Sequence, residues 1–161
     1  GGVDPLYLAR RMTRMAVEDV GLAEPRAWRM ALDAWDTYER LGSPEGELAL
    51  AQLVIWLAIS PKSNAAYMAY NKARDAVREG GTLEVPMHLR NAPTKLMKGL
   101  GYGKGYQYDH DAEGGIALDQ QCLPEGLEGS IFYEPVERRL ELQLREKLLA
   151  LRAAREKARH P

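Results

Sequence analysis

Residues 99–106 contain the residue types that hold phosphates in nucleotide-binding loops. Glycines at every second position surround Lys104 in the sequence GLGYGKGY. A phosphate-binding loop, however, has four residues between its first glycine and the Gly-Lys pair, a hydroxyl residue after the lysine, and a strand before it. Here Gly105 follows Lys104, and the preceding residues have helical spacing. The sequence therefore favours a tight turn, because glycine accepts positive φ angles at little cost.

The same region has the composition of a nucleic-acid contact. Between Pro86 and Tyr108 there is no Asp or Glu, while cations and tyrosines are frequent. Cations neutralise phosphates and tyrosine rings stack on bases. Tyrosines also bury well against their own protein, so a structural interpretation stays open beside the binding one. The residues that we expect to contact DNA or a partner protein are Arg90, Lys95, Lys98, Tyr102, Lys104 and Tyr106.

Residues suited to catalysis or metal binding are sparse. Asp109, His110 and Asp111 are adjacent, but adjacent residues rarely point at one ion, and no second cluster supplies further ligands. The single cysteine, Cys122, excludes an internal disulfide and a cysteine-based zinc site. The chain has three histidines and no serine nucleophile elbow. We therefore expect no catalytic, cofactor or metal site in this chain.

A largely helical chain must position these residues. Capping residues and spacing predict helices in segments 5–20, 25–41, 43–61 and 62–81, a short helix near 93–100, and a terminal helix over 136–159. Arg10, Arg11 and Arg14 fall mostly off the apolar stripe of the first helix. From 48 to 59 only Gln52 is polar, which predicts a buried central helix. Residues 82–135 lack helical spacing and are expected to form a long, largely irregular arm.

The terminal helix carries an apolar stripe and a basic surface. It has eight Lys or Arg and three Glu between Arg138 and Arg159. A basic amphipathic helix packs on its own domain or on another subunit, or it lies on a membrane or on nucleic acid. Leu142 and Leu149 lie off the apolar stripe, so the apolar surface of the helix is broad. A broad apolar surface favours packing on two sides, and hence packing between subunits. The residues that we expect to pack there are Leu140, Leu144, Leu148 and Leu151.

The bulk composition is that of a single folded domain. The 161 residues are 45% hydrophobic and 28% charged, which allows one core. A net charge of -1 gives no global attraction to nucleic acid or membrane. No apolar run reaches the length of a membrane span, so we expect no membrane partner. The single cysteine fits a reducing environment, and we expect a cytoplasmic location. The chain starts without Met, and we expect it to be part of a longer protein.

Several stretches together resemble one known family. They are DPLYLARRMTRMAVEDVGLAEPRA, SPEGELALAQLVIWLAISPKSNAAYMAYNKARDAV, PMHLRNAPTKLMKGLGYGKGYQYDHD and LPEGLEGSIFYEP, in that order. The chain is similar to the C-terminal region of the replication-associated recombination protein A family of AAA+ ATPases. The eukaryotic relatives of that family are the Werner-helicase-interacting and maintenance-of-genome-stability ATPases. The resemblance extends over nearly the whole chain.

The resemblance implies a fold, a partner and a parent activity. It implies an all-α helical bundle like the C-terminal collar of clamp loaders, in which residues 5–20 belong either to the collar or to the preceding lid subdomain. It also implies a homo-oligomer, expected to be a tetramer. The parent would bind ATP and Mg, and would act on DNA with single-strand-binding protein at stalled forks, near the nucleoid. No Walker motif is present in this sequence, so we expect the ATP site to lie outside it.

Overall fold

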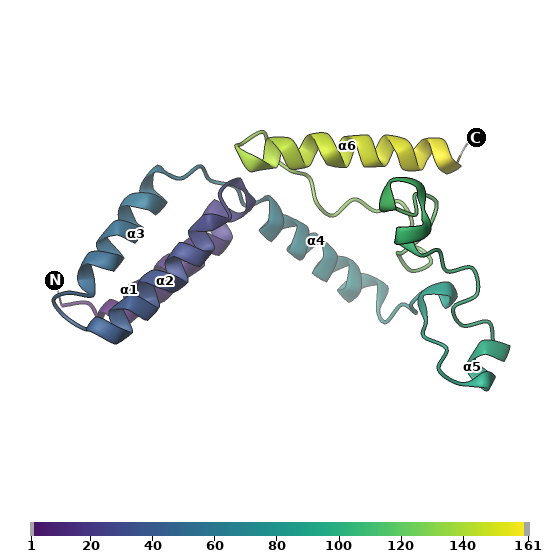
Figure 1. Ribbon diagram of the computed structural model, residues 1–161, viewed down its shortest axis with the longest axis horizontal. Helices are drawn as coiled ribbons and strands as arrows, with labels where there is room; N and C mark the ends of the chain where they lie inside the picture. Colours follow the sequence, from purple (N-terminus) through teal and green to yellow (C-terminus); the bar gives the residue numbers. More distant parts are fainter. Residues whose placement is uncertain (1, 160–161) are drawn as a thin grey trace. The chain divides into compact units, whose positions relative to one another are not determined.

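The computed structural model describes residues 2–159 and divides into two compact units. Unit 1 comprises the residues up to 72 together with Phe132–Glu146, and unit 2 comprises Ala73–Ile131 together with the residues from 147 onward. Residues 2–159 form six α-helices and no strand, which confirms the all-α prediction (Figure 1). Two helices, α4 (Ala65–Gly80) and α6 (Leu140–Arg159), run from one unit into the other.

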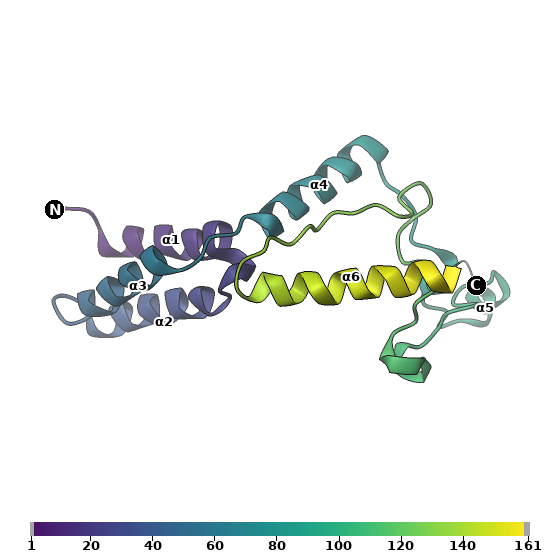
Figure 2. The same cartoon turned by 90° about the horizontal axis from the view of Figure 1, so that it is seen from above.

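Unit 1 is built on three helices that lie side by side, as Figures 1 and 2 both show. They are α1 (Pro5–Met15), α2 (Arg26–Leu41) and α3 (Glu47–Ile59). Pro5 occupies the first position of α1, and the side chain of Asp4 accepts a hydrogen bond of 2.9 Å from the Leu6 amide. Because the first amides of a helix lack partners within the helix, this cap stabilises the predicted start.

The end of α1 departs from a regular helix. Ala16–Val20 forms a single π-helical turn, and Gly21–Ala23 forms a 3-10 turn. Gly21 has a φ of 52°, and the neighbouring Asp19 carbonyl accepts a hydrogen bond of 2.7 Å from the Ser63 amide. The chain between α3 and α4 is thereby attached to the end of α1, which is a tertiary contact that helical spacing does not predict.

The core of unit 1 is made mainly of small residues. Ala27 and Ala31 of α2 are completely buried, as are Ala9 of α1 and Leu53 of α3. Alanine side chains allow the axes of packed helices to approach closely. Trp35 and Tyr38 of the same helix pack against this core, whereas Trp28 is 55% exposed.

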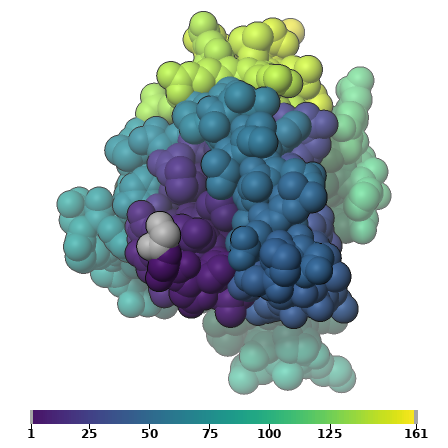
Figure 3. Space-filling view, turned by 90° about the vertical axis from the view of Figure 1, so that its left-hand side faces the viewer, coloured from purple at the N-terminus to yellow at the C-terminus, as the bar shows by residue number. Residues whose placement is uncertain are grey.

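The helix predicted to be central is buried on one side only. Leu50, Leu53 and Leu57 of α3 belong to the core, but Ile55 and Ile59 are 63% and 76% exposed. The prediction of a helix buried all round was therefore wrong. Within unit 1, α3 packs mainly against α2 and α1, and part of α3 lies on the molecular surface beside α1 (Figure 3).

Unit 2 has little regular structure and a small core. Its helix α5 is short (Lys95–Gly99), and 3-10 turns occur at Met87–Leu89, Asp109–Asp111 and Glu113–Gly115. Ala117, at 4% exposure, is the one buried apolar residue among those described in this unit. Residues that hold this unit together must therefore do so largely through polar contacts.

Candidate interaction surfaces

Arg90 holds two parts of unit 2 together. Its Nε donates a hydrogen bond of 2.6 Å to the Val85 carbonyl, and a terminal nitrogen donates one of 2.7 Å to Glu84. Its guanidinium lies 5.4 Å from the ring centre of Tyr102. The pKa of Glu84 is lowered, mainly because its carboxylate accepts the hydrogen bond from Arg90. Of the six residues predicted to bind DNA or a partner, Arg90 and Tyr102 thus contact each other within the protein.

The three predicted lysines have a different environment. Lys95 and Lys98 are exposed on α5, and Lys104 is exposed in the turn that follows. None of the three forms an ion pair with any residue in the range 2–159. Tyr106 is 50% exposed. These four side chains are therefore accessible to a ligand. Lys95 and Lys98 lie on α5, which begins at a cap in which the Thr94 hydroxyl accepts a hydrogen bond from the Met97 amide.

The glycine-rich turn does not offer a phosphate cradle. Gly101, Gly103 and Gly105 all have positive φ angles, which confirms the predicted tight turn. The amides of Gly103, Lys104 and Tyr106 donate to the carbonyls of Met87, Gly101 and Gly103. A phosphate-binding loop must direct its amides toward the ligand. These amides are used within the protein, so the geometry does not fit ATP.

The Asp109-His110-Asp111 sequence forms a 3-10 turn. Asp109 accepts a hydrogen bond of 2.8 Å from the Ala117 amide, and the rings of Tyr108 and His110 lie 4.9 Å apart. Within residues 2–159, no group of three or more His, Cys, Asp or Glu is arranged to hold a metal ion. Asp109 thus shapes the local chain.

The leucine stripe of α6 is only partly available. Leu140 is 38% exposed, and Leu144, Leu148 and Leu151 are half-buried. Leu142 and Leu149, which lie off the stripe, are 43% and 51% exposed. Leu140 and Leu144 belong to unit 1, and Leu148 and Leu151 belong to unit 2, so the stripe spans both units along one helix. Packing between subunits stays a prediction for these four residues.

The exposed side of α3 is a surface that the sequence interpretation missed. Leu48 is 64% exposed and Val54 is 53% exposed, in addition to Ile55 and Ile59. Ala51 and Ala58 are exposed on the same helix. The signal was present, since the helix is apolar on nearly all sides, but it was interpreted as complete burial. We refer to Leu48, Val54, Ile55 and Ile59 as the α3 outer face.

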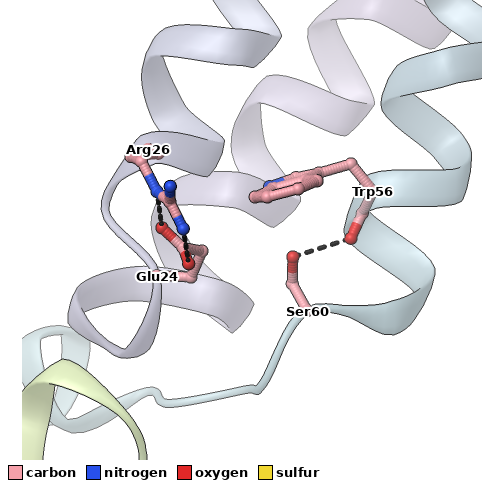
Figure 4. Close-up of polar contacts among 4 residues, drawn as sticks. All are labelled: Glu24, Arg26, Trp56 and Ser60. Carbon is pink, nitrogen blue, oxygen red and sulfur yellow. Dashed lines mark hydrogen bonds and ion pairs between the residues drawn. The ribbon is translucent and has the colours of Figure 1, made fainter.

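A polar cluster fixes the end of α3 against the start of α2 (Figure 4). Arg26 donates hydrogen bonds of 2.7 and 2.8 Å to the two carboxylate oxygens of Glu24. The guanidinium of Arg26 also lies 5.5 Å from the ring centre of Trp56, in the last turn of α3. The Ser60 hydroxyl donates a hydrogen bond of 2.7 Å to the Trp56 carbonyl, where the helix ends. These contacts support the helix that carries the outer face.

The fold is that of a helical domain, and the comparisons place it among the C-terminal domains of AAA+ ATPases. Residues 1–152 match the family described as MgsA AAA+ ATPase C terminal, and the chain belongs to this family. None of the helices in residues 2–159 combines the length and the apolar character that crossing a lipid bilayer requires.

The relatives carry names from replication and recombination. The chain is 57% identical to replication-associated recombination protein A of Coxiella burnetii over 92% of this chain and 34% of that protein. It is 48% identical to the protein of the same name in Escherichia coli, over 91% of this chain and 33% of that protein. The ATPase WRNIP1 of Dictyostelium discoideum is 41% identical over 83% of this chain and 15% of that protein. The chain thus spans about a third of the length of its bacterial relatives, and the resemblance found in the sequence is confirmed.

Proposed function

We propose that this chain is a non-catalytic C-terminal domain that joins copies of an AAA+ ATPase into a homo-oligomer, expected to be a tetramer. The observation that supports this function is the α3 outer face, whose four large apolar side chains are each more than half exposed. A contiguous exposed apolar surface is costly in water and usually marks a contact with another protein. Symmetric homo-oligomers commonly bury such a surface against the same surface of a second copy.

The parent ATPase is proposed to act in replication-fork maintenance and recombination. The names of the relatives support this assignment. In this proposal ATP and Mg bind in the parent outside this chain, because the glycine-rich turn uses its amides internally. DNA and single-strand-binding protein are partners of the parent, no membrane is involved, and the location is the cytoplasm, near the nucleoid.

The assembly proposal is tested by the mass of the isolated chain in solution. Light scattering after gel filtration at tens of micromolar protein should give a multiple of 18.0 kDa. The variant Ile55→Lys/Ile59→Lys should give the monomer mass, because two charges on the outer face cannot be buried without partners. The control is Val77→Lys/Leu96→Lys, which places two charges at positions that are 62% and 73% exposed and should leave the mass unchanged.

Three results would contradict this assignment. A wild-type monomer at all salt concentrations would exclude autonomous assembly. Dissociation by Leu144→Lys/Leu148→Lys, together with no effect of the α3 variant, would place the contact on α6 instead. Release of phosphate from ATP by this chain above background would show that the domain is catalytic.

The second candidate function is contact with DNA or a partner protein through the acid-free segment in residues 88–108. It is favoured by Lys95, Lys98 and Lys104, which are exposed and form no ion pair with the described residues. Replacing all three by alanine should weaken any binding of a labelled oligonucleotide that uses this segment and should lower its salt dependence. Unchanged binding would remove the segment as a DNA contact.

A further inference from the structure

Three arginines and a tyrosine form a row on the exposed side of α1. Tyr7, Arg10, Arg11 and Arg14 are spaced by three, one and three residues, which places them on one face of an α-helix. Tyr7 is 52% exposed, the Arg14 side chain is 63% exposed, and Arg10 and Arg11 are exposed. The row lies on a helix that the proposed assembly does not use.

The surface between these side chains is hollowed. A hollow of about 250 Å³ is lined by Tyr7, Arg10, Arg11 and Arg14 and by no other residue. A neighbouring hollow of about 180 Å³ is lined by Arg11 and Arg14 together with Met15, Glu18 and Asp19. The two hollows therefore share Arg11 and Arg14, and together their lining residues follow the chain for more than two helical turns.

The charges along the row are unequal. Arg14 donates hydrogen bonds of 2.7 and 3.1 Å to the two carboxylate oxygens of Glu18, so this arginine is held in place and its charge is largely balanced. The pKa of Glu18 is lowered mainly by these bonds, and to a smaller degree by the charge of Arg11. Arg10 forms no ion pair with the described residues. No Asp or Glu occurs from residue 5 to residue 17.

We propose that this row is a nucleic-acid binding site in which Arg10 and Arg11 contact backbone phosphates and the Tyr7 ring stacks on a base. The inference goes beyond the assembly function and concerns a different helix. Arg10 and Arg14 are separated by about 6 Å along the helix axis, since each residue rises 1.5 Å, so long side chains from the row reach successive phosphates. An extended polyanion engages the whole row, whereas a single phosphate engages one guanidinium.

The tyrosine distinguishes a nucleic acid from an acidic peptide. A polymer of carboxylates matches the arginine charges equally well, but it has no flat ring to place on an exposed tyrosine. Stacking of a base on an aromatic side chain contributes about 1–3 kcal/mol. Tyr7 lies at the end of the row that is farthest from Glu18 and Asp19, and the nearest carboxylate in the sequence at this end, Asp4, accepts a hydrogen bond from the Leu6 amide as the helix cap.

The test is fluorescence anisotropy with a labelled single strand of about 30 nucleotides at about 50 mM salt. Arg10→Ala/Arg11→Ala should weaken binding about tenfold or more and should reduce the slope of log affinity against log salt by about 1.4, since each phosphate contact to a single strand contributes about 0.7. Tyr7→Ala should weaken binding about fivefold or more with no change in that slope. Circular dichroism checks that each variant keeps its helices.

Matched controls separate this site from general charge. Arg29→Ala/Arg40→Ala removes the same charge from exposed positions on α2 and should change affinity less than twofold. Arg10→Ala/Arg11→Ala should lower the affinity for the oligonucleotide by the same factor in the wild-type background and in the background of Lys95→Ala/Lys98→Ala/Lys104→Ala. The proposal is overturned if the wild-type chain does not bind, if the α2 control loses as much affinity as the α1 variant, or if polyglutamate at equal charge displaces the oligonucleotide fully.

Discussion

The phenol oxygen of Tyr133 donates a hydrogen bond of 2.8 Å to Oε1 of Glu141 in unit 1. Glu141 is the second residue of α6 and is completely buried. Its other oxygen, Oε2, has no hydrogen-bond partner among the described residues. A buried carboxylate that loses a donor keeps the cost of leaving water without compensation. The tyrosine hydroxyl is therefore expected to stabilise the start of α6.

Tyr133→Phe should lower the free energy of unfolding by about 1–3 kcal/mol at pH 7, because it removes the donor and keeps the ring. Urea unfolding followed by circular dichroism measures the change. Tyr106→Phe is the control, since Tyr106 is 50% exposed and its hydroxyl should contribute nothing measurable. Equal stability of Tyr133→Phe and wild type would show that the Glu141 carboxylate is satisfied without this hydroxyl.

The same pair predicts how stability changes at high pH. The pKa of Tyr133 is raised, mainly because burial penalises the phenolate and further because the hydroxyl donates to Glu141. The folded state keeps this proton at pH values where the unfolded chain has lost it, so this contribution declines as pH rises above about 10. The stability difference between wild type and Tyr133→Phe should narrow over that range. A constant difference between pH 7 and pH 11 would contradict the assignment.

Arg26→Ala should destabilise unit 1, because Glu24 is only 6% exposed and loses its two hydrogen bonds. The pKa of Glu24 is lowered, mainly by hydrogen bonding to Arg26. The stabilisation is thus present above the unfolded carboxyl pKa of about 4.3 and is lost as pH falls below it through the folded pKa. Thermal unfolding at pH 7 and at acid pH measures the change.

The control for Arg26 is Arg29→Ala. Arg29 pairs with Asp33 on the exposed surface of α2, where both side chains are more than half exposed. Such a pair stabilises little. Arg29→Ala should therefore unfold close to wild type at both pH values, and an equal effect of the two variants would show that burial of Glu24 is unimportant.

Gly21→Ala should be among the most damaging single substitutions in unit 1. A Cβ atom at position 21 would lie 2.5 Å from the Ser63 carbonyl oxygen, and the φ of 52° is unfavourable for any other residue. Backbone strain and steric overlap together should lower the free energy of unfolding by about 3 kcal/mol or more. Gly42→Ala is a matched control, because its φ is 68° with no atom within 4 Å of the added Cβ, and it should cost about 1–2 kcal/mol. Equal losses would show that the contact at Ser63 relaxes freely.

Local chemistry in the sequence predicted some helix ends, but α3 begins at Glu47 and α6 at Leu140, each four residues later than predicted. Asp4 and Pro5 start α1, and Gly42 ends α2, because caps and φ preferences act within a few residues. The π-helical turn at Ala16–Val20 was not predictable, since it accompanies a tertiary hydrogen bond from the Ser63 amide to Asp19. Contacts between distant residues leave no mark in helical spacing.

The interaction surfaces were less predictable than the helices. The apolar sequence of α3 predicts that the helix is buried, but it does not indicate whether the same chain or another chain covers it. Arg90 was assigned to binding from its charge, and only the structure shows its bonds to Glu84 and Val85. Arg10 and Arg11 were interpreted as residues off the apolar stripe, since charge on an exposed helix face is common.

Arg90→Ala should loosen unit 2 around the glycine-rich turn while leaving unit 1 unchanged. Arg90 bonds to Glu84 and Val85 and lies over Tyr102, and this unit has little apolar core to compensate for the lost contacts. Hydrogen exchange measured by mass spectrometry should speed up for peptides from 84–103, with unchanged protection in α2. Arg90→Lys should not restore protection. The guanidinium of Arg90 donates at the same time to the Glu84 carboxylate and to the Val85 carbonyl, and a lysine ammonium lacks this planar arrangement of donors. Full protection in Arg90→Ala would contradict the structural role and would favour Arg90 as a free binding residue.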